Sequence, residues 1–489
     1  MIEYDIVIIG GSLAGRYAAL RAKQLCAKVA LVEPEVSSEF QHLNALSHIA
    51  FLKQKIEHQS EFGLYNLASL EPTSKQSVPS QIGVDWEVSM LRSFGVESQL
   101  LSQYSLPLVA AQGVDVIVAN GQFEQNHRHL AFSANNRLLV GRTYLLATGS
   151  RYVAPDIEGL HKTGFLTLEN IWKSFGAKTP PQNWVILGGT PQSIELAQTL
   201  VRLNFSVTLI VKGSKIISYI DPEVVQLLEA QLEADGLRIL KQTQVTQILQ
   251  IDGKKWLQVG DKAIETDEIV FAAEQMPNIQ SLNLADVGVK WYKNRLLVNE
   301  KLQTTNKYIY ACGDVIGGYT LTNIANYEAD IALRNALFFP INKIDYQSVP
   351  WEIVTQPILA HVGIIEAQAR KIYNPHEIIV MRQYFKSLPL AQLRDETTGI
   401  CKLITLKNGE ILGASVLGLE AGELINLISI AINHKIKISQ IAKTTLVYPT
   451  VGEILLNAAH EWSKIRRSKN TAKQEFLQDF FHFRRNWKL

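Results

Sequence analysis

Residues 5–15 read Asp-Ile-Val-Ile-Ile-Gly-Gly-Ser-Leu-Ala-Gly, and residues 29–33 read Val-Ala-Leu-Val-Glu. The first apolar run does not alternate with polar residues, which is typical of a strand buried on both faces. The glycines that follow open a helix expected over 16–26, and a second apolar strand then ends in an acid. This order of strand, glycine-rich turn, helix and strand predicts a dinucleotide-binding βαβ unit.

Several positions of this unit have a physical role in holding a dinucleotide. Gly10 permits the tight turn out of the strand, Gly15 lets the helix pack closely, and the helix N-terminus presents free N–H groups to a pyrophosphate. Glu33 is placed to accept a hydrogen bond from a ribose hydroxyl. A small serine replaces the middle glycine and is expected to be tolerated. The candidate residues of this first site are Gly10, Gly11, Ser12, Ala14, Gly15 and Glu33.

A second copy of the unit starts at residue 183, where residues 183–195 read Asn-Trp-Val-Ile-Leu-Gly-Gly-Thr-Pro-Gln-Ser-Ile-Glu. Two copies predict two dinucleotide sites, as in a protein that passes electrons between two cofactors. Thr190 and Ser193 replace the second and third glycines, and the β-branched Thr190 obstructs a pyrophosphate. A retained fold with a weakened site therefore stays open as an alternative. The candidates here are Gly188, Gly189 and Glu195.

The strand expected over 206–211 has no acid at its end. Lys212 follows it directly, and Lys215 comes soon after. A cation in place of a carboxylate favours a 2′-phosphate over a 2′-hydroxyl, which predicts NADPH rather than NADH. The alternative is that both lysines are ordinary solvated surface residues.

Length and composition narrow the class of protein. A chain of 489 residues is expected to form two to four domains, and a formal charge of +2 gives no reason to expect a nucleic-acid partner. No apolar stretch reaches the roughly 18 residues of a spanning helix, and no room for a signal peptide precedes the first strand, so a cytoplasmic location is expected. The three cysteines form no metal-binding pattern, and Cys26 and Cys401 are expected to be core residues.

Residues 308–314 read Tyr-Ile-Tyr-Ala-Cys-Gly-Asp. With its surroundings, 297–335, this run resembles the second flavin-binding segment of the pyridine nucleotide-disulfide oxidoreductases, the group of glutathione, lipoamide and mercuric reductases. The opening fingerprint, the Ala-Thr-Gly run at 147–149, Glu195-Leu-Ala-Gln198 and the segment 349–460 extend the resemblance to about Trp462. It implies that the first site binds FAD, with Ala147, Thr148 and Gly149 nearby and Asp314 on the ribityl chain.

The resemblance also implies the fold class and the division into domains. The fold is an α/β fold with two Rossmann-like dinucleotide-binding domains and an α+β C-terminal dimerisation domain, so a homodimer is expected. The implied segments are a first FAD segment over 1–155, an NAD(P) domain over 156–284, a second FAD segment over 285–345, a dimerisation domain over 346–460, and a basic aromatic tail over 461–489 that the resemblance does not cover.

Four departures from the family bear on the chemistry. Members carry a C-x-x-x-x-C pair that relays electrons as a dithiol, whereas this chain has no cysteine between Cys26 and Cys312. His48 stands where a lysine pairs with the glutamate equivalent to Glu195, although an ordinary surface or core histidine is the alternative. The run Tyr-Pro-Thr-Val-Gly-Glu at 448–453 has tyrosine in place of the acid-base histidine. The run Gly-Arg-x-Pro-Asn becomes Glu-Gln-Met-Pro-Asn at 274–278.

These observations predict an FAD-dependent NAD(P)H oxidoreductase, with NADPH favoured, that passes electrons from FAD directly to a small-molecule or quinone acceptor. The candidate catalytic residues are His48, Glu195, Tyr448 and Glu453. Tyrosine, with a pKa near 10, is a hydrogen-bond donor rather than a base at neutral pH. Two alternatives stay open: a transhydrogenase-like flavoenzyme, and a non-catalytic FAD-binding sensor or assembly protein.

The C-terminal tail combines basic and aromatic residues. Phe476, Phe480, Phe483 and Trp487 lie among cations, and Glu475 and Asp479 are the acids of 463–489. The cations are Lys464, Arg466, Arg467, Lys469, Lys473, Arg484, Arg485 and Lys488. Such a segment suits a helix in a membrane interface, and a peripheral contact of this kind would suit a quinone acceptor. The alternative is that the rings dock on the surface of the protein itself.

Overall fold

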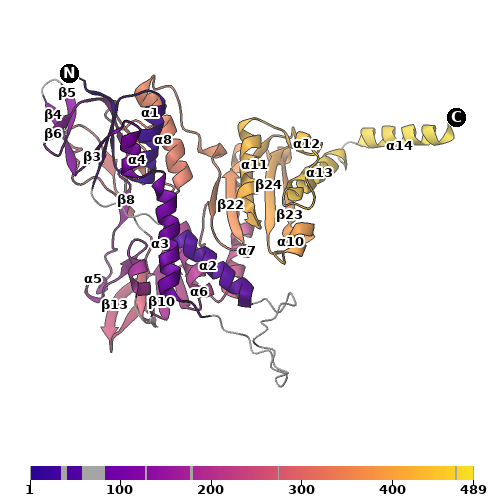
Figure 1. Ribbon diagram of the computed structural model, residues 1–489. Helices are drawn as coiled ribbons and strands as arrows, with labels where there is room; N and C mark the ends of the chain where they lie inside the picture. The colour runs from indigo at the N-terminus through magenta and orange to yellow at the C-terminus, as the bar shows by residue number, and fades with distance from the viewer. Residues whose placement is uncertain are drawn as a thin grey trace. The chain divides into compact units, whose positions relative to one another are not determined.

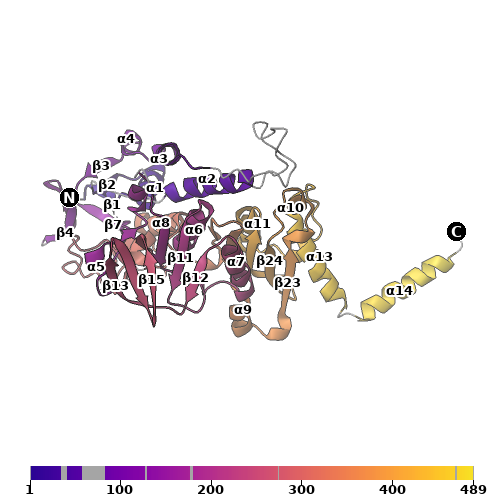
Figure 2. The ribbon, with the colours of Figure 1, turned by 90° about the horizontal axis from the view of Figure 1, so that it is seen from below.

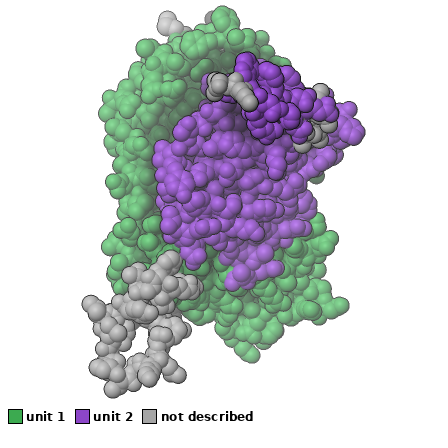
Figure 3. Space-filling model, turned by 90° about the vertical axis from the view of Figure 1, so that its right-hand side faces the viewer, with its two compact units in different colours: residues 1–214, 235–344 green, residues 215–234, 345–489 purple. Residues whose placement is uncertain are grey.

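The computed structural model describes residues 2–34, 41–57, 83–126, 129–176, 180–273, 275–468 and 471–487. The chain forms two compact units, coloured separately in Figure 3: residues 1–214 with 235–344, and residues 215–234 with 345–489. Residues 58–82 lie outside the described residues, and so does Glu274 of the 274–278 run. The domain division expected from the sequence stays a prediction, because the first unit contains both the FAD and most of the NAD(P) segments.

The first unit is built around a parallel sheet with β1 at its centre. The strand order is β20-β7-β1-β2-β3, with bounds Ile309–Ala311, Gly141–Leu146, Tyr4–Ile9, Val29–Glu33 and Asp115–Val118. The apolar run of β1 is buried as expected, with Ile6, Val7 and Ile8 fully inaccessible. Helix α1 (Leu13–Gln24) lies beside α8 (Thr322–Leu337), as Figure 1 shows. The predicted opening βαβ unit is confirmed.

The end of α1 corrects one prediction. The helix ends at Gln24 rather than at 26, and Cys26 follows it in a left-handed conformation with φ 64°. This turn carries the Cys26 side chain into solvent, so the prediction that it is a core residue is wrong. Cys401 is fully buried in β24 (Ile400–Leu406), where the same prediction is confirmed.

A second parallel sheet in the same unit contains the second copy of the motif. Its order is β12-β11-β10-β16-β9, with bounds Arg238–Lys241, Ser206–Val211, Asn183–Leu187, Glu268–Phe271 and Leu166–Thr167. Helix α6 (Pro191–Arg202) follows β10. Helix α2 (Gln41–Glu57) packs against α6 and against α3 (Trp86–Ser102), and Figure 2 shows α2 along α6. The strand, helix and strand expected over 183–211 are confirmed.

Smaller elements complete the first unit. Its antiparallel pieces are β4-β5-β6 (Gly121–Asn126, His129–Ala134, Arg137–Leu139), β13-β14-β15 (Val245–Ile251, Lys254–Val259, Lys262–Thr266), β8 with β17 (Ser150–Tyr152, Gln275–Pro277) and β18 with β19 (Trp291–Tyr292, Arg295–Leu296). Its remaining helices are α4 (Leu106–Ala111), α5 (Leu160–Thr163), η3 (Ile171–Gly176) and η4 (Gly313–Ile316). Strand β8 and η4 matter most here, because they lie in the segments expected to hold FAD, and β17, from the expected NAD(P) segment, pairs with β8.

The second unit is an antiparallel sheet with helices, as expected for an α+β domain. Its strand order is β21-β22-β25-β24-β23, with bounds Trp351–Ile353, Ile358–Gly363, Ile411–Gly418, Ile400–Leu406 and Ile378–Tyr384. Its helices are α7 (Pro222–Ala234), α9 (Glu366–Ile372), α10 (Pro389–Leu393), α11 (Ala421–Asn433), α12 (Ile438–Ile441), α13 (Glu453–Ser468) and α14 (Thr471–Asn486), with short η5 (Tyr346–Ser348), η6 (Pro375–Glu377) and η7 (Phe385–Ser387). In the described part of the chain, no helix is long and apolar enough to cross a membrane.

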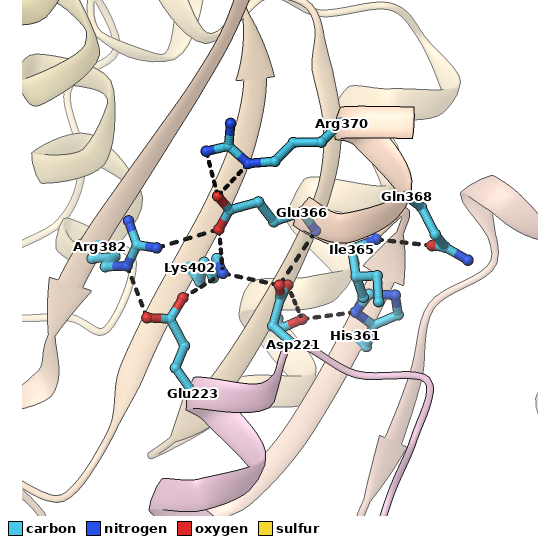
Figure 4. Close-up of polar contacts among 10 residues, drawn as sticks. Asp221, Glu223, His361, Ile365, Glu366, Gln368, Arg370, Arg382 and Lys402 are labelled. Atoms are coloured by element: carbon cyan, nitrogen blue, oxygen red, sulfur yellow. Dashed lines mark hydrogen bonds and ion pairs between the residues drawn. The ribbon is translucent and has the colours of Figure 1, made fainter. Parts of the chain in front are cut away.

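A charge cluster centred on the buried Lys402 and Asp221 joins the start of α7 to the sheet of the second unit (Figure 4). The ammonium group of Lys402, on β24, lies 2.9 Å from Asp221 Oδ1 and 2.7 Å from Glu366 Oε2, and it also pairs with Glu223. Arg382 Nε donates to Glu223 at 2.8 Å. Burial lowers the pKa of Lys402, but its hydrogen bonds to the three carboxylates outweigh burial, and the net pKa is raised. The ammonium group is therefore held in its charged form.

Candidate functional site

The residues of the first site meet at one edge of the first sheet. Ile9 pairs with Val32 and with Leu146, and Leu146 pairs with Ala311, so these parallel strands end level with one another. The segments that follow them are the glycine turn, Glu33, the Ala-Thr-Gly run and Gly313-Asp314. In open α/β sheets, ligands bind outside the carboxyl ends of the strands. The structure thus brings together the residues that sequence reasoning assigned to FAD.

The glycine turn is as tight as the fingerprint requires. Gly10 has φ +117°, and a Cβ there would overlap the carbonyl oxygen of Ala147. A Cβ at Gly15 would overlap the carbonyl oxygen of Gly10, and a Cβ at Gly11 would overlap the side chain of Glu33. Ala14 is buried in the first turn of α1. Larger residues at these glycines would push α1 away from the strand ends, where a pyrophosphate would lie.

Ser12 is the N-cap of α1, and its hydroxyl is bonded within the protein. Its Oγ donates a hydrogen bond of 3.0 Å to the carbonyl oxygen of Ala147 and accepts one of 3.4 Å from the amide of Gly15. The hydroxyl thus satisfies one free N–H of the helix start and ties the turn to the neighbouring strand. The serine that replaces the middle glycine therefore stabilises the start of α1 and the turn before it.

Glu33 is held by a partner that sequence reasoning missed. Arg16, in the first turns of α1, donates from Nη2 to Glu33 Oε1 at 2.5 Å and from Nε to Oε2 at 3.2 Å. Glu33 is 3% exposed. This two-point ion pair fixes the carboxylate beside Gly11, at the end of β2 where a ribose is expected. The signal in the sequence is only a basic residue directly after Gly15, which has no partner until the chain is folded.

The Thr148–Gly149 turn is held by the Pro-Asn end of the 274–278 run. The backbone N–H of Asn278 donates to the carbonyl oxygen of Gly149 at 3.0 Å, and Asn278 Nδ2 donates to that of Thr148 at 3.1 Å. Ser150 Oγ donates to Gln275 Oε1 at 2.9 Å. Asn278 and Gln275 are thus positioning residues that the sequence pattern alone does not assign to the site.

Two polar groups at this edge suit a bound FAD. The Thr148 hydroxyl is buried and has no hydrogen-bond partner among the described residues. Burial raises the pKa of Asp314, directly after β20, to about 6. Buried polar groups are normally hydrogen-bonded, so a partner for such groups is expected from a ligand. Together with the glycine turn, these residues fit the ribityl, ribose and pyrophosphate groups of FAD.

The second site repeats the geometry of the first. Gly188 has φ +156°, and a Cβ there would overlap the carbonyl oxygen of Ala272. Thr190 is the N-cap of α6: its Oγ1 donates to that same oxygen at 2.9 Å and accepts from the amide of Ser193 at 3.2 Å. Gly189 lies between them. Thr190 and Ser12 therefore use their hydroxyls in the same way, each on the strand next to its own glycine turn.

A chain of hydrogen bonds links the second site to the Asp314 segment. Gln192 Nε2, in the first turn of α6, donates to the carbonyl oxygen of Thr320 at 2.6 Å. Thr320 Oγ1 donates to Gln275 Oε1 at 3.3 Å. Thr320 lies between η4 and α8. Within the first unit, the glycine turn of the second site is thus close to the segment assigned to the flavin.

The candidate catalytic residues on α2 and α6 lie on neighbouring helices but differ in exposure. His48 is exposed on α2, whereas Glu195 is 9% exposed on α6. Ser47 Oγ, one residue earlier, lies 2.6 Å from Thr199 Oγ1 and joins the two helices. A His48–Glu195 pair stays a prediction.

The other candidate residues lie at exposed positions or near a helix start. Tyr448 is 71% exposed before α13, and Glu453 Oε1 accepts a hydrogen bond of 3.0 Å from the amide of Thr450. Glu453 therefore stabilises the start of α13. Lys212 is exposed directly after β11, beside the strand that leads into the second glycine turn.

Protein-family comparisons agree with this geometry. Residues 4–329 match the family described as pyridine nucleotide-disulphide oxidoreductase, and residues 349–459 match its dimerisation domain. Mercuric reductase from Staphylococcus aureus is 29% identical over 472 residues, covering 94% of this chain and 83% of the relative. Dihydrolipoyl dehydrogenase from Bacillus subtilis (strain 168) is 26% identical over 472 residues, covering 93% and 97%.

Solved structures share the fold. LpdA from Mycobacterium tuberculosis superposes with a TM-score of 0.81 at 19% identity, covering 93% of this chain and 99% of that one. The HOCl-induced flavoprotein disulfide reductase RclA from Escherichia coli superposes with a TM-score of 0.78 at 23% identity, covering 94% and 99%. The dimerisation domain supports a homodimer. This chain belongs to the pyridine nucleotide-disulphide oxidoreductase family, whose members are FAD-dependent pyridine nucleotide oxidoreductases.

Proposed function

We propose that this chain is an NADPH-dependent flavoenzyme that passes electrons from FAD to its acceptor without a redox disulfide. One observation carries the proposal: the sequence has no cysteine between Cys26 and Cys312, so the family's dithiol has no counterpart. A disulfide relay needs two thiols that can approach each other and a reactive thiolate. An acceptor must then receive its electrons without passing through protein thiols.

The three cysteines that are present do not suit a relay. All are free thiols, and Cys312 and Cys401 are buried. Burial raises the pKa of Cys312 well above its usual value and that of Cys401 to about 12, so both remain protonated at neutral pH. Cys26 is exposed after α1 and lies on a turn rather than on the helix that would carry a relay pair.

The residues of the first site would hold FAD. Glu33, fixed by Arg16, would accept from a ribose hydroxyl, the N-terminus of α1 would face the pyrophosphate, and Asp314 would accept from the ribityl chain. Bound FAD would supply the two-electron chemistry, taking electrons from a nicotinamide nucleotide and releasing them to an acceptor. His48, Glu195, Tyr448 and Glu453 remain the proposed catalytic residues, with Tyr448 acting as a donor rather than a base.

The second site would hold NADPH. The N-terminus of α6 would face a pyrophosphate with the amide of Gln192, because Thr190 Oγ1 accepts from the amide of Ser193 and Pro191 has no N–H. Exposed Lys212 after β11 favours a 2′-phosphate. The acceptor is proposed to be a small molecule or a quinone, reached in the latter case through a peripheral membrane contact of the tail.

An anaerobic titration of the purified protein tests this function. A flavin spectrum is expected as purified, and NADPH is expected to bleach it faster than NADH. The Lys212→Ser variant should lose this preference, whereas Lys262→Ser, an exposed lysine on β15 of the same unit, should keep it. No bleaching by either nucleotide would favour a non-catalytic sensor or assembly protein. Rapid reoxidation by a second nicotinamide nucleotide would favour a transhydrogenase.

Alkylation tests the absence of a dithiol separately. Treatment of the NADPH-reduced protein with iodoacetamide is expected to leave its reduction of a soluble quinone unchanged, and Cys26→Ser should be equally active. A loss of activity that depends on prior reduction would reveal an essential thiol and overturn the direct route. Disulfide substrates such as oxidised glutathione and lipoamide are expected not to reoxidise the flavin.

A further inference from the structure

Most of the exposed aromatic residues of helix α14 share one face, and Phe481, which is also exposed, lies outside it. Phe476, Phe480, Phe483 and Trp487 follow one another at spacings of four, three and four residues, which puts them on one side of a helix. Trp487 directly follows the helix, and its N–H still donates to the carbonyl oxygen of Phe483 at 3.1 Å. We call these four residues the aromatic stripe.

The exposure of the aromatic stripe argues against docking on the protein's own surface. Phe476 and Trp487 are each 66% exposed, Phe483 is 57% exposed, and Phe480 is 43% exposed. The rings contact one another: Phe476 and Phe480 are stacked with centroids 6.4 Å apart, and Phe483 meets Trp487 edge-on at 5.0 Å. Large exposed apolar faces usually mark an interaction site.

The segment that carries this face is basic, and its cations continue into the preceding helix. Arg484 and Arg485 occupy the last turn of α14, and exposed Lys464, Arg466 and Arg467 lie near the end of α13. Glu475 lies about 100° around the helix from Phe476, whereas Asp479 lies three residues after Phe476 and four before Phe483 and so borders the stripe. Lys469 and Lys488 lie outside the described residues. Residues 463–489 as a whole are thus basic, with eight cations against two acids.

We propose that α14 is a peripheral anchor that lies in the interface of an anionic lipid bilayer. The rings would enter the boundary between headgroups and acyl chains, and the cations would meet anionic headgroups. At 16 residues, and with charges along it, α14 is shorter than the roughly 20 apolar residues of a spanning helix, so it would lie along the surface. This anchor deepens the proposed function, because it names the element that would contact the membrane. Binding of α14 to lipid does not depend on the proposed function. Only the link to a quinone acceptor rests on that function.

Flotation of the flavin-loaded protein tests the anchor. Vesicles of phosphatidylcholine with phosphatidylglycerol are expected to carry the full chain upward at low salt, vesicles of phosphatidylcholine alone much less, and added salt should reduce binding. A version ending at Ser468 keeps α13, whose Trp462 and Ile465 pack in the core, and should not float. Failure of the full chain to float on the anionic vesicles would overturn the proposal.

Matched substitutions on α14 separate the aromatic stripe from the rest of the helix. Changing Phe476, Phe480, Phe483 and Trp487 together to serine should lower the bound fraction about tenfold or more, because the apolar contribution is lost. Gln478→Ser with His482→Ser, on the other side of α14, should leave it unchanged. Equal flotation of the two variants would refute the anchor, as would a loss of dimer in the stripe variant without a loss of flotation.

The same samples distinguish failure of the anchor from failure of the proposed function. Flavin content and the rate of bleaching by NADPH in solution are expected to be equal in the full chain, the version ending at Ser468 and both α14 variants. If NADPH reduced the flavin in none of these proteins, the oxidoreductase function would be refuted. Flotation would still test the anchor. Normal reduction without flotation would refute the anchor alone.

Discussion

The hydroxyl of Thr190 donates a hydrogen bond of 2.9 Å to the carbonyl oxygen of Ala272, and the hydroxyl of Ser12 donates one of 3.0 Å to that of Ala147. In both sites the residue that replaces the middle glycine caps a helix and binds the neighbouring strand. In both βαβ units, a side chain with a hydroxyl that caps the helix thus stands in place of this glycine. A hydroxyl engaged on both sides is not available to a ligand, and each cap also occupies one N–H of the first turn, that of Gly15 or of Ser193. A phosphate would meet the other N–H groups of each helix start, which are fewer in α6 because Pro191 has none.

Removing the Thr190 hydroxyl is therefore expected to cost stability. Thr190→Ala should lower the free energy of unfolding by about 1 kcal/mol, because an N-cap hydrogen bond and the link to Ala272 are both lost. Thr190→Ser keeps the hydroxyl and should stay within a few tenths of a kcal/mol of the original protein. Urea denaturation of the flavin-free protein measures both. A Thr190→Ala protein as stable as Thr190→Ser would show that the cap contributes nothing.

Arg16 is expected to matter for FAD because it orients Glu33. Arg16→Met should weaken FAD binding about tenfold, since the carboxylate loses a two-point partner and no longer has a fixed position at the end of β2. Arg21→Met is the matched control on α1, because Arg21 pairs with Asp330 at 3.2 Å in a more exposed setting. Its effect on FAD should be small. Fluorescence titration of the flavin-free proteins with FAD measures these affinities. An affinity of Arg16→Met equal to that of the original protein would contradict the positioning role of Arg16.

Asp314 gives a pH dependence that FAD should alter. Its pKa in the folded, flavin-free protein is about 6, raised by burial, against about 3.9 when unfolded. Between these values the folded state binds more protons, so the free energy of unfolding falls as pH rises from about 4 to 6. Asp314→Asn should then be more stable than the original protein by roughly 2 kcal/mol at neutral pH, and this gain should vanish below about pH 4.

Urea denaturation of the flavin-free proteins across this pH range measures that gain, with Asp286→Asn, an exposed position in the same unit, as the control. With FAD bound the order should reverse, because the carboxylate would have a hydroxyl donor from the ribityl chain and the asparagine variant should bind FAD more weakly. A pH-independent difference between Asp314→Asn and the original protein would rule out titration of Asp314 as its source.

The sequence predicts the parts of this molecule that depend on local pattern. Each βαβ unit, around Gly10 and around Gly188, is encoded by consecutive residues. Its strand, turn and helix can therefore be predicted from the sequence alone. The Ser12 and Thr190 caps depend on carbonyl groups of Ala147 and Ala272, more than eighty residues away, and were not foreseen. The exposure of Cys26 was missed for a different reason: the helix ends two residues early, and hydrophobic periodicity does not fix such ends.

The cluster around Lys402 lies wholly beyond sequence reasoning, because its acids come from the segment before α7, from α7 itself and from α9, while the lysine is on β24. Lys402→Met should lower the free energy of unfolding by about 3–5 kcal/mol, since it leaves the carboxylate of Asp221 buried without its charged partner. Lys343→Met removes an exposed pair with Glu300, at 2.6 Å, and should cost at most about 1 kcal/mol.

Acid should weaken the same cluster. Burial raises the pKa of Glu223 and Glu366, but hydrogen bonds outweigh it, chiefly from Arg382 to Glu223 and from Lys402 to Glu366, so both pKa values are lowered. Their contribution to stability is present above the unfolded pKa of about 4.3 and is lost as pH falls through the lower folded values. In Lys402→Met both pKa values rise toward that of an unfolded chain, so the variant should lose less stability on acidification. Denaturation curves of the two proteins at neutral and acidic pH measure this, and parallel losses would show that Lys402 does not set the charge state of these acids.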